Sequence, residues 1–189
     1  MAALYELLSI LVTSFALNLI PFAGPSNLFI ASNVALLVNV DPLTIGFLVA
    51  LGAASAKLIH YLITFFVSGF IGEQRRKRLD AAGLKLKHWA FLALFMVAAT
   101  PLPDEPVIIP LGLMKYSPIK FYLSYFLGKL SITIVGAYLG RFSQQFLAPW
   151  LSPEILVVAS IILTILVTVV LLKVDVAKIA KKIFRRDVI

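Results

Sequence analysis

The sequence predicts an all-α integral membrane protein with two inverted repeats, each a re-entrant hairpin plus a transmembrane helix, followed by a C-terminal transmembrane helix. Three observations lead to this fold class: the composition, a repeated pattern of prolines in apolar runs, and the position of the basic residues. Apolar residues make up 61% of the 189 residues, charged residues only 14%, and the mean hydropathy is +1.00. Soluble domains have roughly 45–50% apolar and about 25% charged residues, so the bilayer is the expected solvent.

The net charge of +8 comes largely from two basic blocks that flank long apolar stretches. The blocks are Arg75, Arg76, Lys77, Arg78, Lys85 and Lys87, and then Lys173, Lys178, Lys181, Lys182, Arg185 and Arg186. Such blocks mark the cytoplasmic side of membrane proteins and attract anionic lipid headgroups. The charge is not spread as a basic face, so no nucleic acid is expected as a partner. Cysteine is absent, which excludes disulfides and cysteine metal sites.

Five apolar stretches follow one another along the chain, at about residues 2–40, 43–71, 89–114, 119–139 and 155–172. A spanning helix needs roughly 20 apolar residues, and the second, fourth and fifth stretches meet that length. These three stretches are therefore predicted to cross the membrane as helices.

The first and third stretches are interrupted by helix-breaking residues. The first contains Pro21, Gly24 and Pro25, and the third contains Pro101, Pro103, Pro106 and Pro110. Proline removes a backbone donor and disfavours helix before it, and non-helical backbone at membrane depth must be covered by protein or face a water-filled cavity. We therefore expect two re-entrant hairpins with non-helical tips around Pro21–Pro25 and Pro101–Pro110. The alternative is a kinked spanning helix, which a single proline would favour.

The same spacing of helix breakers occurs in both halves of the chain. Intervals of 17 and 10 residues separate Pro25, Pro42 and Gly52, and the same intervals separate Pro101, Pro118 and Gly128. Ser55 and Ser131 then fall at the same offset. Discontinuous segments at matching places in two halves are typical of transporters and point to the substrate site.

The repeats and basic blocks divide a single membrane domain, residues 1–189, into five parts. They are repeat 1 (about 5–71), a basic cytoplasmic loop (73–88), repeat 2 (about 89–142), a C-terminal helix (154–172) and a basic tail (173–189). Positive residues favour the cytoplasmic side. The N-terminus, which has no Lys or Arg before Lys57, is therefore predicted to lie outside, and the C-terminus to be cytoplasmic.

Two acidic residues, Asp104 and Glu105, lie at the tip of the second predicted hairpin. Ionisable groups at membrane depth are costly, so they indicate a functional site. Burial favours the neutral form of a carboxyl group, which suits a proton carrier. In the alternative interpretation, the tip reaches the headgroup region and the two acids cap a helix N-terminus.

Lys57 and Lys129 lie well inside the long helices of the two repeats. We expect them to face inward as phosphate ligands or carboxylate partners, the alternative being that they snorkel to an interface. His60, one turn from Lys57, is a candidate proton shuttle or a hydrogen-bonded packing residue. Asp104 and Glu105 are expected to lie close to at least one of Lys57, Lys129 and Arg141.

Three asparagines and four glycines are further candidates. Asn27 is expected to line a polar cavity, whereas Asn18 and Asn33 are expected to satisfy broken backbone. Close helix packing is the expected role of the glycines, which are Gly52, Gly128, Gly136 and Gly140.

No catalytic signature is found in the sequence. Two distant histidines do not make a metal-ligand cluster, and neither a Gly-rich phosphate loop nor a serine nucleophile motif occurs. The sequence therefore predicts a protein that is not an enzyme and holds no cofactor and no metal.

The segment Pro101–Gly112, followed by Phe121 and Gly128-Lys129, resembles the DedA/VTT family, also called SNARE-associated membrane proteins. The segment Pro21–Asn27, followed by Gly52 and Tyr61, is similar to the first-repeat motif of that family. The resemblance covers about residues 15–142 and rests on short motifs that are mostly proline and glycine.

The resemblance implies two inverted re-entrant hairpins, a prokaryotic plasma membrane location and movement of lipids across the bilayer, in some members driven by the proton-motive force. The chain departs from the family pattern in two ways. Members often have an acid near the positions of Asn27 and Leu28, which puts a two-acid proton mechanism in doubt. Many also have an arginine pair after the second hairpin, for which Lys129 and Arg141 are the nearest candidates.

The sequence and the resemblance together predict a lipid transporter, that is, a flippase or scramblase, with proton coupling as a further expectation. Its substrate would be an anionic lipid, either a phospholipid or a polyprenyl phosphate, whose phosphate lies near Lys57, Lys129 and Arg141. Membrane lipids and their anionic headgroups are the expected partners, with a second copy of the chain as a further candidate. Two alternatives are a small-solute or ion exporter and a non-transporting membrane organiser.

Overall fold

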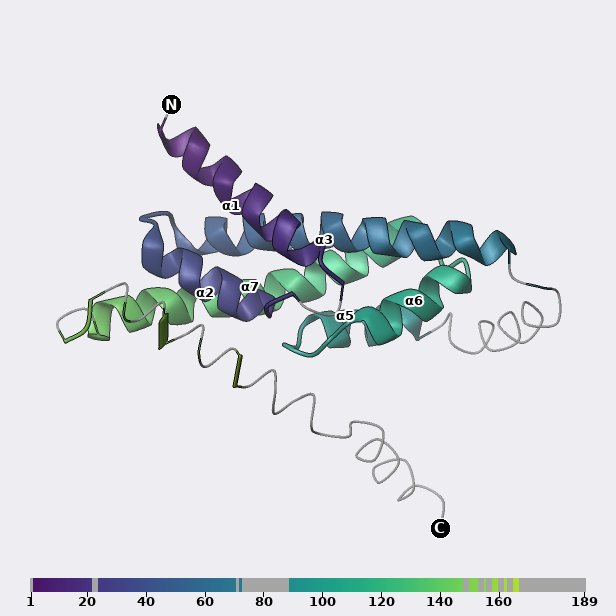
Figure 1. Cartoon of the computed structure of the whole chain (residues 1–189). Helices are drawn as coiled ribbons and strands as arrows, with labels where there is room; N and C mark the ends of the chain where they lie inside the picture. The colour runs from purple at the N-terminus through teal and green to yellow at the C-terminus, as the bar shows by residue number, and fades with distance from the viewer. Residues whose placement is uncertain are drawn as a thin grey trace, which may run out of the picture.

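A computed structural model describes residues 2–21, 24–70, 72 and 89–147, together with scattered positions between 150 and 166. The secondary structure of these residues is entirely helical (Figure 1). The predicted basic loop and basic tail lie outside the described residues, as does most of the predicted C-terminal helix.

The first half contains three α-helices in the order that the sequence predicts: α1 (Ala2–Asn18), α2 (Asn27–Leu37) and α3 (Pro42–Val67), which ends in a short 3-10 turn, η1 (Ser68–Phe70). The segment between α1 and α2, residues 19–26, is called the first break, and its described residues are not helical. At the start of α3 the Asp41 carboxylate accepts hydrogen bonds from the amides of Leu43 and Thr44, at 3.0 and 3.2 Å. An acid of this kind satisfies amides that have no partner within the helix.

The second half repeats this order with α5 (Ala90–Ala98), α6 (Glu105–Leu113) and α7 (Pro118–Leu147). The segment between α5 and α6, residues 99–104, is called the second break and is not helical. The expectation that the non-helical tip extends to Pro110 is wrong, because Pro106 and Pro110 both lie within α6. Pro106 is tolerated in the first turn, where an amide would have no partner in the helix. Pro110 lies inside the helix, at the loss of one backbone hydrogen bond.

The two long helices α3 and α7 run antiparallel and form the centre of the molecule (Figure 1). Near one end, the Thr133 hydroxyl donates to the Gly46 carbonyl at 2.8 Å. Near the other end, the rings of Tyr61 and Phe121 stack with centroids 4.2 Å apart. Residue numbers therefore rise along α3 as they fall along α7, which places Pro42 and Pro118 at opposite ends of the pair.

Equivalent glycines bring the first short helix of each half against the long helix of the same half. A Cβ atom added to Gly52 would lie 2.7 Å from the Leu11 carbonyl oxygen of α1, and one added to Gly128 would lie 2.5 Å from the Phe95 carbonyl oxygen of α5. Only a glycine allows backbones to approach so closely. The predicted packing role of these glycines is confirmed, and Gly136 and Gly140 have the same role against α2.

The second short helix of each half packs against the long helix of the other half. Gly136 and Gly140 of α7 contact the backbone of α2 at Leu28 and Ser32, and α6 contacts α3 where Gly112 meets Thr64. This exchange interlocks the two halves. It also brings the first and second breaks together beside the centre of the α3–α7 pair, where they line one cavity.

Two described helices are long and apolar enough to cross a membrane, Pro42–Phe70 and Pro118–Phe146, with 29 residues each. At a rise of about 1.5 Å per residue each extends roughly 43 Å, more than the ~30 Å of a hydrocarbon core. Large apolar side chains remain exposed along both, among them Phe47, Ile63, Phe66, Leu123, Leu127, Val135 and Phe142. The fold is thus compatible with an all-helical membrane protein.

The close approach at Gly128 predicts that an added methyl group destabilises the fold. Gly128→Ala should lower the free energy of unfolding by about 1–3 kcal/mol, because the methyl collides with backbone that cannot easily move. Gly69→Ala is the matched control, since a Cβ atom at Gly69 meets nothing within 4 Å. Thermal unfolding of both variants in detergent measures the difference, and equal melting temperatures would contradict the packing role.

Candidate functional site

Four charged side chains meet where the second break approaches α3 and α7. They are Lys57 of α3, Asp104 at the end of the second break, Glu105 at the start of α6 and Lys129 of α7, and they are called the charge cluster. All four residues are buried, with only 3–5% of their surface exposed. Their formal charges sum to zero.

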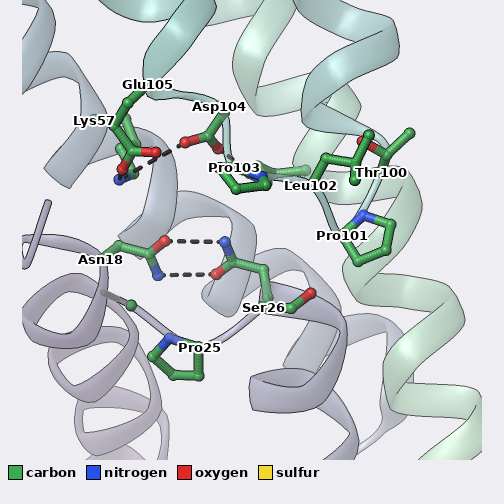
Figure 2. A pocket seen from close by; sticks show the side chains of 13 residues that line it. Asn18, Pro25, Ser26, Lys57, Thr100, Pro101, Leu102, Pro103, Asp104 and Glu105 are labelled. Atoms are coloured by element: carbon green, nitrogen blue, oxygen red, sulfur yellow. Dashed lines mark hydrogen bonds and ion pairs between the residues drawn. The ribbon is translucent and has the colours of Figure 1, made fainter. Parts of the chain in front are cut away.

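Lys57 connects α3 to both acids of the cluster. Its Nζ atom lies 2.6 Å from Glu105 Oε1 and 3.7 Å from Asp104 Oδ1 (Figure 2). Because the lysine is buried and ion-paired, the alternative in which it snorkels to an interface is wrong. Lys57 therefore holds the second break and the start of α6 against the middle of α3.

Lys129 connects α7 to the same break. Its Nζ atom lies 2.9 Å from Asp104 Oδ2, and the Tyr125 hydroxyl donates to that same oxygen. The ammonium also lies over the Tyr125 ring, 5.2 Å from its centroid. The prediction that Asp104 and Glu105 lie close to at least one of the named cations is confirmed for both lysines.

The backbone at Asp104 explains how its side chain can reach these partners. The Asp104 carbonyl accepts from the amides of Val107 and Ile108, at 3.0 Å each, and so begins α6. Its carboxylate makes no capping hydrogen bond. The alternative that the acids cap a helix is therefore wrong for Asp104, whose carboxylate is committed to the lysines and Tyr125.

A neutral amide pair closes the first break. Asn18 at the end of α1 and Asn27 at the start of α2 exchange two hydrogen bonds, at 2.8 and 2.9 Å (Figure 2). Asn18 also donates to the Ser14 carbonyl within α1 at 2.8 Å. Because Asn18 lines the cavity as well, the expectation that it only satisfies broken backbone is wrong. Asn33 likewise donates to the Phe29 carbonyl of its own helix at 2.9 Å.

His60 contacts the first break rather than the acids. Its Nε2 atom lies 3.0 Å from the Leu19 carbonyl oxygen, and this nitrogen must carry the proton because a carbonyl can only accept. The other ring nitrogen, Nδ1, is buried without a hydrogen-bond partner in the described part of the chain. His60 therefore ties α3 to the end of α1.

Arg141 does not join the charge cluster. Its guanidinium donates to the carbonyls of Val38 and Val40, at 3.3 and 2.6 Å, and to Gln144 at 3.1 Å. Arg141 is twelve residues from Lys129 on α7, or about 18 Å along the helix. The expectation that it lies near the same phosphate position as Lys129 is therefore wrong: Arg141 holds the turn between α2 and α3.

A cavity of about 80 Å³ lies between the two breaks and the charge cluster. Figure 2 shows the two breaks facing each other across it, with Pro25 and Ser26 on one side and Pro101 and Pro103 on the other. Its lining consists of Asn18, Gly24, Pro25, Ser26, Asn27, Lys57, Thr100, Pro101, Leu102, Pro103, Asp104, Glu105 and Lys129. The cavity therefore joins polar groups of both halves and offers room for several water molecules or a small polar headgroup.

Tyr125 and Ser26 were not among the site residues predicted from the sequence. Tyr125 precedes Lys129 by one helical turn, a spacing that places both on one face of α7 and was available as a signal. Ser26 directly precedes α2 within the predicted tip, a position where a hydroxyl usually caps the helix. The Pro21 ring also lies in the first break but does not line the cavity.

The geometry predicts strong coupling between Asp104 and Lys129. Removing one member of a buried ion pair costs about 3–5 kcal/mol, because the other charge is left buried and alone. Asp104→Asn and Lys129→Gln should each lower the free energy of unfolding. The double variant should lower it by much less than the sum of the two single losses. Unfolding titrations in detergent measure this, with the exposed Lys120→Gln on the same helix as control. Additive losses would show that the pair is not coupled.

Comparison with known proteins agrees with the resemblance found in the motifs. The model of the VTT domain matches residues 24–142, which is more than half of the chain and includes the charge cluster, the whole second break and the end of the first break. No curated protein and no solved structure matches the chain. The protein therefore belongs to the DedA/VTT family of membrane domains, which is generally associated with membrane transport.

Proposed function

We propose that this protein moves anionic lipids, either phospholipids or polyprenyl phosphates, across the membrane, and that it is a transporter and not an enzyme. The observation that carries the proposal is the cavity in which two buried lysines meet both breaks. The phosphate headgroup enters this cavity, while the acyl or prenyl chains remain in the bilayer. Lysine side chains bind phosphate as compact point charges.

The arrangement of the helices supports two inverted, re-entrant hairpins. The short helices α5 and α6 have nine residues each, so each extends only about 14 Å, roughly half of a hydrocarbon core of ~30 Å. The long helices are antiparallel, and α2 and α6 each pack against the long helix of the other half. The two halves therefore run through the membrane in opposite directions. Both breaks then lie near the middle of the membrane, where inverted-repeat transporters bind their substrates.

The charge cluster supplies a mechanism for release and capture of the headgroup. An anionic phosphate competes with the carboxylates of Asp104 and Glu105 for the two lysines. The cluster is neutral, so an added anion leaves one uncompensated negative charge in the membrane, which is costly. Protonation of a carboxylate removes that charge and frees a lysine, so the contact between the phosphate and that lysine is coupled to proton uptake.

The mechanism predicts how transport responds to substitution of the cluster. Glu105→Gln should flatten the pH dependence of lipid flipping, because a permanently neutral side chain no longer needs a proton to release Lys57. Lys129→Gln should lower the flipping rate by tenfold or more, since a charge-assisted hydrogen bond contributes about 1.5–3 kcal/mol. A liposome assay with labelled phospholipids across a pH series measures both.

Lys120→Gln is the matched control in this assay, because Lys120 is exposed on the same helix as Lys129. It should retain the wild-type rate and pH profile. If Asp104→Asn, Glu105→Gln and Lys129→Gln all behave like this control, the proposed site is wrong and a non-transporting membrane organiser becomes the better account.

The inverted arrangement predicts that the two long helices begin on opposite sides of the membrane. A cysteine at Asn39, exposed before α3, should be labelled by an impermeant reagent from outside. A cysteine at Lys120, exposed at the start of α7, should be labelled only from the cytoplasmic side. The cysteine-free chain gives both experiments a clean background. Labelling of both positions from the same side would contradict the inverted topology.

A further inference from the structure

Ser26 lines the cavity, and its hydroxyl has no hydrogen-bond partner among the described residues. Its Oγ atom is buried. Ser26 occupies the N-cap position of α2 with extended backbone angles, φ −59° and ψ 137°, yet its side chain does not cap the helix. Nearly all buried polar groups in folded proteins have a partner, so this hydroxyl needs an explanation.

The start of α2 supplies further donors at the same place. The amides of Phe29 and Ile30 donate to the Ser26 carbonyl, at 2.9 and 3.0 Å. The amides of Asn27 and Leu28 have no helical carbonyl within reach, because the first amides of any helix lack one. The positive end of the helix dipole adds to these donors. The eleven residues of α2 thus present a hydroxyl and two amides from one helix end.

The two breaks differ in how the following helix begins. The start of α6 has its own acids, Asp104 and Glu105, whereas the first turn of α2 contains no acidic residue. The nearest acids that line the cavity are those of the charge cluster, and both are ion-paired with lysines. The N-terminus of α2 therefore has no acidic side chain in its first turn, unlike the N-terminus of α6.

We propose that the N-terminus of α2, with the Ser26 hydroxyl, is the seat for the phosphate group of the ligand. This inference rests on the proposed function for its lipid source and deepens it by naming where the phosphate binds first. A phosphate ester has several acceptor oxygens. It can accept from the Ser26 hydroxyl and from the amides of Asn27 and Leu28, and still present an oxygen to a lysine of the charge cluster.

This seat separates capture of the phosphate from disruption of the ion pairs. The hydroxyl and the two amides carry no full charge, and the hydroxyl has no hydrogen bond to give up, so the phosphate binds there while Lys57 and Lys129 remain paired. Freeing a lysine by protonation is then a second step. Phosphate binding at the seat should accordingly be less sensitive to Glu105→Gln than flipping is.

The test measures binding by the full chain in a phosphate-free, non-ionic detergent. The probes are a short-chain phosphatidic acid, the matching diacylglycerol without phosphate, and inorganic phosphate. Ser26→Ala should weaken phosphatidic acid binding about tenfold, because one charge-assisted hydrogen bond is lost. Ser26→Thr, which keeps the hydroxyl, should bind with near wild-type affinity. The control is Ser131→Ala, which should also keep that affinity, because the Ser131 hydroxyl is exposed on α7 and donates to the Leu127 carbonyl.

Two further readouts separate binding from folding. The ligand-free melting temperature of Ser26→Ala should not fall, since its hydroxyl has no partner to lose, but the stabilisation by phosphatidic acid should shrink. The diacylglycerol should bind the wild type and Ser26→Ala equally. If inorganic phosphate competes with phosphatidic acid, the seat binds phosphate of any source. If it does not compete, the seat requires the lipid ester. Both results support the seat.

Unchanged phosphatidic acid affinity in Ser26→Ala, or an equal loss in Ser131→Ala, would overturn the inference. Its failure is distinguishable from failure of the proposed function. Lipid flipping that persists with wild-type binding in Ser26→Ala refutes the seat and leaves the transporter standing. Ser26-dependent binding without any flipping leaves the seat standing and refutes the transporter.

Discussion

The pairing of charges inside an apolar fold is the constraint on which the rest of the structure depends. A lysine or a carboxylate buried without a partner costs several kcal/mol, so Lys57 and Lys129 must find acids or water. Asp104 satisfies this need for both lysines at once and thereby fixes the second break between α3 and α7. The breaks in turn expose backbone groups that only a polar, protein-covered place can accommodate. The charge cluster, the two breaks and the cavity are therefore parts of one structural feature.

The exchanged packing explains why the two halves act as one unit. Each long helix carries the first short helix of its own half and the second short helix of the other, with glycines at the close contacts. Neither half can bury the surface of its second short helix without its counterpart.

The ends of the long helices are held by contacts with the turns that precede the long helices. Arg141 binds the turn before α3, and the Tyr61 hydroxyl donates to the Tyr116 carbonyl in the turn before α7. Contacts from both halves therefore hold the long helices in place.

Local patterns in the sequence predicted the parts of the fold that depend on local physics. The spacing of Pro25 and Pro42, and of Pro101 and Pro118, located the breaks and the long helices, and the depth of the lysines indicated ionic partners. The length of the second break was predicted wrongly, because whether Pro106 ends or begins a helix depends on capping and packing and not on proline alone. Arg141 was wrongly expected near the phosphate, and the Asn18–Asn27 pair was missed, because contacts between helices depend on rotation and crossing that no single segment encodes.

The two halves share a backbone plan but differ in charge at their breaks, and the proposed mechanism uses this difference. The first break has no charged side chain and contains the unpartnered Ser26 hydroxyl. At the second break, Asp104 and the adjacent Glu105 of α6 are ion-paired with lysines. If both breaks were acidic, an anionic headgroup would meet repulsion from each side of the cavity. If both were neutral, the lysines would hold the phosphate too strongly to release it. In the proposed mechanism, one neutral and one acidic break would give the phosphate a place to bind and give the lysines an alternative partner when it leaves.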